Sequence, residues 1–257
     1  MSSDEIALGG GSMTRVVRVG DSVRRPTGRW SPAVHSLLRH LEEVGFEGAP
    51  RILGIDDHGR EVLSYLPTER TWPYSEEALV HASRLIRRLH DALASFVPPA
   101  GAVWRYPASG RHTGPDARVG HNDLGPNNTV FAGSRPYGFI DWDLAGPAAP
   151  LDDLALAAIN FTPLRPDRFC QGVGFSEPPD RAARLGIFCD AYGLEEPLAL
   201  LDAIEAFQQE SLREMREDGV QGVSPYATFL ANGEDRFVEW DLEWFRANRR
   251  QLEGALQ

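Results

Sequence analysis

Hydrophobic and polar positions follow two different patterns along the chain. In the first third, short apolar runs end at Gly or Pro turn signals, which predicts strands over 14–19, 22–25, 51–55 and 61–66. Between the second and third of these, Ser31-Pro32 supplies an N-cap with proline at the first helical position, apolar residues follow at helical spacing, and Gly45 ends the helix. The first third is therefore predicted to be a small sheet carrying one helix.

The remainder of the chain has mainly helical periodicity. Helices are predicted over 75–96, 181–192, 197–218 and from 235 to the C-terminus, with Gly193 and Gly219 ending the second and third; two short β segments are predicted over 129–131 and 138–140. Residues 162–180 are rich in Pro and Gly and predict a long loop. We therefore predict an α+β fold with a β-rich N-terminal lobe over 1–68 and a larger, mainly helical C-terminal lobe over 69–257.

Composition and charge exclude several classes of protein. The 257 residues are 42% hydrophobic and 25% charged, which is ordinary for a globular chain and excludes wholesale disorder. The formal net charge of −11 argues against a non-specific nucleic-acid binder or a binder of anionic membranes. The sequence contains no lysine, so its 26 basic residues are all arginine. Any side-chain cation that contacts a phosphate must therefore be an arginine.

The chain also has few features of a secreted or membrane protein. The two cysteines, Cys170 and Cys189, lack metal-ligand spacing and are too few for a disulfide framework. The N-terminus does not have the pattern of a signal peptide, and no apolar run reaches the length of a membrane span. These observations predict a cytoplasmic protein.

The strongest chemical signal is a loop of the pattern His-x-Asp-x4-Asn. It contains His121, Asp123 and Asn128, and a further acid, Asp141, follows the Asn by 13 residues at the end of a predicted strand. Phosphoryl transfer needs a held nucleotide, a divalent metal and an oriented nucleophile. Because Mg²⁺ takes few protein ligands, Asn128 and Asp141 can supply oxygens to it, while Asp123 can act as base toward an acceptor hydroxyl.

This region resembles the aminoglycoside phosphotransferase family of the protein-kinase-like superfamily. The resemblance rests on the His-x-Asp-Leu-x-Pro-x-Asn run, on Ile-Asp-Trp at 140–142, on Asp-Leu-Ala at 153–155 and on Leu-His at 89–90. It implies a bilobal kinase-like fold that binds ATP (or GTP) and Mg²⁺. It further implies that Asp123 is the catalytic aspartate, that Asn128 and Asp141 are the metal ligands, and that His121 braces the loop through hydrogen bonds.

The N-terminal region departs from the family pattern. The run Gly9-Gly10-Gly11 stands where such kinases cover the nucleotide phosphates, and it is interpreted either as an anion cradle or as a flexible terminus. The lysine on the third strand has no lysine counterpart; Arg24 is the first candidate to replace it and Arg25 the second, since alternation sends only one of them into the site. The family's glutamate on the first helix is absent, and Val34 and His35 occupy that region.

Other polar residues have weaker interpretations. Asp143 is a second-metal ligand or a solvated carboxylate, Asp152 a turn residue, Asp153 an anchor of the catalytic loop, and His90 a bracing histidine. Three glutamates of the 197–218 helix either line an acceptor pocket for an aminated sugar or form a solvated charged face: Glu205, Glu210 and Glu214.

These observations lead to two hypotheses about function. The first is an ATP- and Mg²⁺-dependent kinase that phosphorylates a hydroxyl of a small molecule, an aminoglycoside being one candidate, with neither nucleic acid nor membrane as partner. The second is a nucleotide-binding protein of the immunity type that keeps the fold without useful turnover. A protein kinase is disfavoured because Asn122 and Gly125 replace the Arg and Lys of its catalytic loop. A metal-dependent phosphohydrolase fails because no second histidine lies near His121 to complete a metal shell.

Overall fold

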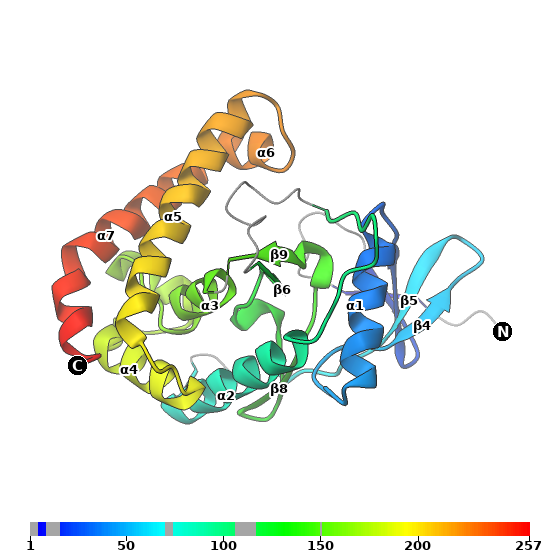
Figure 1. The fold of residues 1–257 in the computed structure, drawn as a ribbon, viewed down its shortest axis with the longest axis horizontal. Helices are drawn as coiled ribbons and strands as arrows, with labels where there is room; N and C mark the ends of the chain where they lie inside the picture. Colours follow the sequence, from blue (N-terminus) through cyan, green and yellow to red (C-terminus); the bar gives the residue numbers. More distant parts are fainter. Residues whose placement is uncertain (1–4, 9–15, 70–73, 106–116, 150) are drawn as a thin grey trace. The chain divides into compact units, whose positions relative to one another are not determined.

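The computed structural model describes residues 5–8, 16–69, 74–105, 117–149 and 151–257 (Figure 1). Contacts within it group the chain into two compact units. Unit 1 comprises 1–70, 85–123 and 127–149, and unit 2 comprises 71–84, 124–126 and 150–257. The predicted N-terminal lobe, 1–68, falls inside unit 1, which also includes residues 69–70, 85–123 and 127–149 of the predicted C-terminal lobe.

Unit 1 is built on a five-stranded antiparallel sheet with the strand order β1-β2-β3-β5-β4. The strands are β1 (Ile6–Leu8), β2 (Val16–Val19), β3 (Ser22–Pro26), β4 (Ile52–Ile55) and β5 (Arg60–Ser64). The four predicted strands are confirmed with end shifts of a few residues, whereas β1 is three residues long and was not predicted. In the β3–β5 register Arg25 lies opposite Glu61, and Arg24 lies opposite Val62. Because neighbouring residues of a strand project to opposite faces, the two arginines serve different faces of the sheet.

Helix α1 (Ser31–Glu43) follows β3 and buries Leu37, Leu38 and Leu41. The predicted N-cap at Ser31 is wrong, because Trp30 occupies the cap position and Ser31 is the first helical residue. The Ser31 hydroxyl instead accepts a hydrogen bond of 2.9 Å from the Gly28 N–H and so closes the turn that precedes the helix.

The described part of unit 1 also contains two short two-stranded antiparallel sheets, of which only β7–β8 is a hairpin. Strand β6 (Arg118–Gly120) pairs with β9 (Gly146–Ala148), and β7 (Thr129–Ala132) pairs with β8 (Arg135–Phe139). Strand β8 passes close to Gly48, whose carbonyl accepts a 2.7 Å hydrogen bond from the Phe139 N–H. A Cβ at Gly138 would lie 2.8 Å from that same carbonyl oxygen, so only glycine allows this approach. This contact fixes the strand that leads into Asp141.

Helix α2 (Glu76–Leu93) begins in unit 2 and ends in unit 1. Its predicted apolar face is confirmed, because six residues at helical spacing are at most 4% exposed: Leu79, Ala82, Leu85, Ile86, Leu89 and Leu93.

Unit 2 is helical. It contains α3 (Asp152–Phe161), α4 (Arg181–Tyr192), α5 (Pro197–Val220), α6 (Tyr226–Ala231) and α7 (Asp235–Gly254), with α5 and α7 side by side and α6 packed against α5 (Figure 1). The predicted end of α5 at Gly219 is wrong, since the helix continues to Val220. Helices α3 and α6 were not predicted. The 162–180 region is largely loop, with two single 3-10 turns (Asp167–Phe169 and Gln171–Val173).

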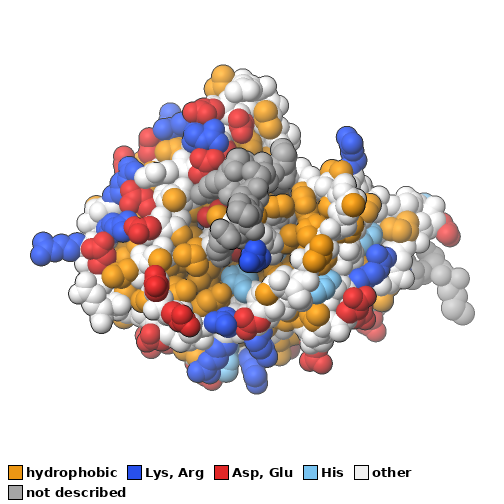
Figure 2. Space-filling model, viewed as in Figure 1, with side chains coloured by type: hydrophobic (Ala, Val, Ile, Leu, Met, Phe, Trp, Pro, Cys, Tyr) orange, Lys and Arg blue, Asp and Glu red, His pale blue; other side chains and the backbone are white. Residues whose placement is uncertain are grey.

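Charged side chains of both signs are mixed along α5 and α7 on the face drawn in Figure 2. They form ion pairs within and between these helices; Arg249, for example, pairs with Asp202, Glu205 and Glu253. No helix in the described part of the chain is long and apolar enough to cross a membrane.

Candidate active site

The predicted catalytic loop is closed by one amide side chain. Asn128, at the end of a 3-10 turn over Pro126–Asn128, donates through Nδ2 to the Asp123 backbone carbonyl at 2.9 Å and to Asp123 Oδ2 at 2.7 Å. The loop therefore presents an acid and an amide as one unit. Because the amide nitrogen faces Asp123, the amide oxygen is the atom of Asn128 that can meet a cation.

Asp141 follows strand β8 and Asn128 precedes strand β7, so both lie at the open end of the β7–β8 hairpin. The Ile140 N–H donates to the Asn128 carbonyl at 2.9 Å, and Asp141 is the residue that follows Ile140. Asp141 has a φ of 64°, a left-handed conformation that is uncommon outside glycine and is found often at functional sites. Its side chain is 48% exposed. Asp123, Asn128 and Asp141 are thus gathered at one end of the hairpin.

His121 and Asn122 hold the loop against the segment around Asp141. His121 is fully buried; its Nε2 lies 3.1 Å from the Ile140 carbonyl oxygen, and its ring packs at 4.5 Å from that of Trp142. Asn122, with a φ of 60°, donates through Nδ2 to the carbonyls of Leu144 and Gly146, both at 3.1 Å. Because these contacts join the loop to the segment around Asp141, they fix one relative to the other. The sequence analysis missed Asn122, which it treated only as a departure from protein kinases.

Arg25, not Arg24, is the arginine that lies beside Asp141. Arg25 Nη1 donates to Asp141 Oδ1 at 3.3 Å, Nη2 contacts Asp143, and Nε lies 2.9 Å from Glu61 Oε1. Arg24 instead hydrogen bonds Ser22 and lies 3.8 Å from an Asp56 oxygen. The structure therefore places Arg25, the second candidate, and not Arg24 beside Asp141.

Asp143 is an anchoring carboxylate rather than a solvated one. Its side chain is 10% exposed, and it contacts Arg25, Arg105 and the Trp30 indole N–H, the last at 3.2 Å. The Arg105 guanidinium also lies over the Trp30 ring, 4.6 Å from its centre. Burial raises the pKa of Asp143, as does the neighbouring Asp141 carboxylate, while the two arginines act in the opposite direction. Sequence reasoning missed Arg105 and Trp30, which no motif marks.

Glu61 and His35 form the other side of the Arg25 environment. Glu61 Oε2 lies 2.5 Å from His35 Nε2, and both residues are buried. No sequence motif marks Glu61, which the sequence analysis names only as the start of a predicted strand. The signal that could have found it is the pairing of β3 with β5, which sets Glu61 directly opposite Arg25.

The remaining candidates have different environments. The Gly9-Gly10-Gly11 run lies outside the described residues. The interpretation of Asp152 as a turn residue is wrong, since it is buried in the first turn of α3, as is Asp153. The glutamates of α5 are engaged in contacts along the helices: Glu205 with Arg246 and Arg249, Glu210 with Arg213, and Glu214 with the Tyr226 hydroxyl.

The oxygen donors present fit a magnesium ion. Mg²⁺ usually takes one or two protein carboxylates and completes its shell with phosphate and water oxygens. Asp141 offers a half-exposed carboxylate and Asn128 an amide oxygen. The described residues contain no group of three or more His, Cys, Asp or Glu that could hold a metal ion.

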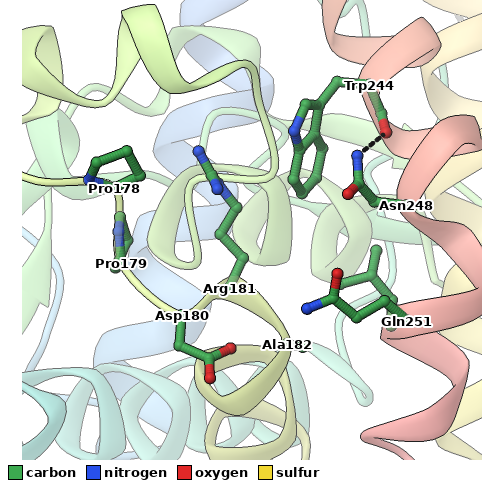
Figure 3. Close-up of a pocket in the computed structure, with 9 residues that line it drawn as sticks. Pro178, Pro179, Asp180, Arg181, Ala182, Trp244, Asn248 and Gln251 are labelled. Carbon is green, nitrogen blue, oxygen red and sulfur yellow. Dashed lines mark hydrogen bonds between the residues drawn. The ribbon is translucent and has the colours of Figure 1, made fainter.

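A separate pocket of about 300 Å³ lies within unit 2, between the start of α4 and the end of α7 (Figure 3). Arg181 lies over the Trp244 ring at 4.8 Å and donates to the Pro163 carbonyl, and Asp180 caps α4. Its charged groups are thus engaged in holding the helices, and none of the candidate residues lines it.

The chain has a kinase-like fold, with a β-sheet region and a larger helical region. Asp123, Asn128 and Asp141 lie together at one end of the β7–β8 hairpin within it. Two solved structures show the same fold: an ADP-bound aminoglycoside phosphotransferase APH(2″)-Ib, with a TM-score of 0.61 and 13% identity over 94% of each chain, and a streptomycin–ATP complex of APH(2″)-IIa, with a TM-score of 0.59 and 13% identity over 94% of this chain and 93% of that one.

Sequence comparison identifies the family. The model of the phosphotransferase enzyme family matches residues 97–187, which include the catalytic loop and Asp141. The trifolitoxin immunity protein of Rhizobium leguminosarum bv. trifolii is 37% identical over 265 residues, covering 99% of both chains. The chain belongs to the aminoglycoside phosphotransferase family, and its fold and family support a small-molecule phosphotransferase.

Proposed function

We propose that this protein transfers the terminal phosphoryl group of ATP (or GTP) to a hydroxyl of a small molecule, with aminoglycosides as the first acceptors to test. The observation that carries the proposal is the double hydrogen bond of Asn128 to Asp123, together with the backbone pairing of Asn128 with the residue before Asp141. These contacts gather at one end of a hairpin the carboxylate that we take as the base and the two side chains that we take as metal ligands. That is the set of groups phosphoryl transfer requires.

Each side chain has a distinct role in this reaction. Asp123 accepts the proton of the acceptor hydroxyl as its oxygen bonds to phosphorus and the bond from phosphorus to the leaving nucleoside diphosphate breaks. Asn128 orients the Asp123 carboxylate through Nδ2, and it would hold Mg²⁺ together with Asp141. When bound, Mg²⁺ neutralises charge on the phosphate oxygens.

The proposal is tested by incubating the purified protein with ATP, Mg²⁺ and a panel of aminoglycosides, amino alcohols and sugars, while ADP and acceptor mass are followed. We expect an acceptor to gain one phosphate and Asp123→Ala to abolish that gain. In Asp141→Ala we expect Mg²⁺-dependent nucleotide binding to be lost. Turnover that survives Asp123→Ala would refute the assignment of the base.

A second candidate is a nucleotide-binding immunity protein without useful turnover. Two observations favour it: the named relative is an immunity protein, and the Arg25 guanidinium is already engaged by three carboxylates. Tight binding of ATP with no ADP formation on any acceptor would support this candidate over the kinase.

A further inference from the structure

Glu61 is a buried acid that uses both of its oxygens on other side chains. Oε1 lies 2.9 Å from Arg25 Nε and Oε2 lies 2.5 Å from His35 Nε2. Glu61 is 4% exposed, and Arg25 and His35 are each 8% exposed. A carboxylate this far from water is tolerated when it is paired and hydrogen bonded; here Arg25 supplies the ion pair and His35 the hydrogen bond.

The contacts form a chain that ends at Asp141. Glu61 holds the Nε side of the Arg25 guanidinium, and this directs the two terminal nitrogens toward Asp141 and Asp143. The pairing is set by the fold itself, because Arg25 and Glu61 are direct partners across β3 and β5 and project from the same face. Since a carboxylate can only accept, the His35 ring must donate from Nε2, which ties α1 to the same chain.

We propose that Glu61 and His35 are positioning residues that set Asp141 for metal binding by way of Arg25. The sequence has neither the family's lysine on β3 nor its glutamate on α1. In their place, Arg25 stands on β3 and the chain of contacts His35–Glu61–Arg25–Asp141 positions Asp141. The acid comes from β5, and α1 contributes a histidine that holds it. This proposal rests on the proposed function, because it takes Asp141 as a metal ligand.

The test measures ATP binding by calorimetry at a series of Mg²⁺ concentrations in the full-length protein, alongside thermal unfolding without ligand. Residues that orient a metal ligand typically contribute 10- to 100-fold to metal affinity. We therefore expect Glu61→Gln to raise the Mg²⁺ concentration for half-maximal ATP binding about 10-fold. His35→Leu should shift it in the same direction, and His35→Gln, which keeps a donor, should restore much of it.

Asp56→Asn is the control, because Asp56 lies in the turn between β4 and β5, pairs with Arg60 at 2.8 Å and does not contact Arg25, Asp141 or Asp143 in the described structure. It should leave the Mg²⁺ midpoint unchanged.

If Glu61→Gln and His35→Leu lower only the unfolding temperature and keep the parent's Mg²⁺ midpoint, the pair is structural and the proposal is wrong. If Glu61→Gln does not fold, the comparison of His35→Leu with His35→Gln decides the question. A parent that shows no Mg²⁺-dependent ATP binding would instead refute the proposed function.

Discussion

At the scale of single residues, Arg25 is unusual because one nearly buried guanidinium pairs with three carboxylates. Its side chain is 9% exposed, and it faces Glu61, Asp141 and Asp143. The buried carboxylates of Glu61 and Asp143 would be costly without a cation, because burial removes them from water. A forked guanidinium can meet several carboxylates at once, whereas a lysine ammonium is a compact point charge. An arginine at position 25 can therefore pair with more than one acid, as this chain shows.

Replacing Arg25 by alanine should destabilise the protein far more than the same change at Arg24. Removing one partner of a buried ion pair typically costs about 3–5 kcal/mol, and Arg25→Ala leaves several acids without their cation. Arg24 is 19% exposed, and the Asp56 oxygen nearest it is 3.8 Å away, so Arg24→Ala should cost about 1 kcal/mol or less. Urea unfolding of both variants measures the difference, and equal losses would contradict the assignment.

Asp241 is a partly buried acid of unit 2, with a side chain that is 17% exposed. Burial raises its pKa to about 6, and Arg165, whose Nη2 lies 3.9 Å away, only partly opposes the shift. Arg165 also donates to Asn160 Oδ1 at 3.2 Å, and Asn160 Nδ2 donates to the Leu124 carbonyl at 3.0 Å. Asp241 is therefore linked to the residue that follows Asp123.

The raised pKa of Asp241 predicts the sign of a pH effect on stability. Between about pH 4 and pH 6 the folded protein keeps this carboxyl protonated while the unfolded chain ionises it, so the contribution of this group to stability falls as pH rises. Two pH units correspond to about 2–3 kcal/mol. Asp241→Asn should therefore be more stable than the parent at pH 7, and the gain should vanish near pH 4.

Unfolding free energies of parent and Asp241→Asn at a series of pH values measure this effect. A variant whose stability difference from the parent is the same at pH 4 and pH 7 would show that the carboxyl titrates normally in the folded state.

At the scale of elements, the sequence predicts best where one face of an element is polar. Helix α2 was predicted because its buried residues recur every three or four positions between charged ones. Helix α3 was missed because eight of its ten residues are buried and leave no polar face to mark the period. Strands β6 and β9 have three residues each and pair across a long separation, which a local pattern does not reveal.

The same limit applies to the candidate site. Asp123, Asn128 and Asp141 lie close together along the chain around one hairpin, so their spacing was enough to group them. The choice between Arg24 and Arg25, and the role of Glu61, depend on the register of β3 against β5, which brings together residues 36 positions apart. Alternation alone allows either arginine to face the site.

The close passage of β8 over Gly48 predicts the effect of a small change at Gly138. A methyl group there would lie 2.8 Å from the Gly48 carbonyl oxygen and 3.1 Å from Val130, so the strand must move. Gly138→Ala should cost about 1–3 kcal/mol of stability and weaken Mg²⁺-dependent nucleotide binding, because β8 leads into Asp141. Gly172→Ala is the control, since its Cβ would meet nothing within 4 Å. Unfolding and binding values equal to the control's would contradict this account of β8.

At the scale of the whole molecule, the backbone passes between the two units five times. One passage lies inside the continuous helix α2, and two bound the short segment 124–126, which separates Asp123 from Asn128. Local unfolding of unit 2 would therefore disturb the ends of elements that hold the candidate site in unit 1. We infer that the two units unfold cooperatively.

The two cysteines provide a probe of this cooperativity. Cys170 and Cys189 both belong to unit 2 and are at most 2% exposed, and burial raises the pKa of the Cys189 thiol to about 12. Because the thiolate is the reactive form, neither should react with a thiol reagent until unit 2 opens, and both should react in denaturant.

A ligand held by unit 1 residues at 100 times its Kd stabilises the folded state by about 2.7 kcal/mol. If unit 2 opens only when the whole chain unfolds, Mg²⁺ with ATP at that level should slow labelling about 100-fold. A labelling rate unchanged by the ligand, in a protein shown to bind it, would mean that unit 2 opens independently of the site.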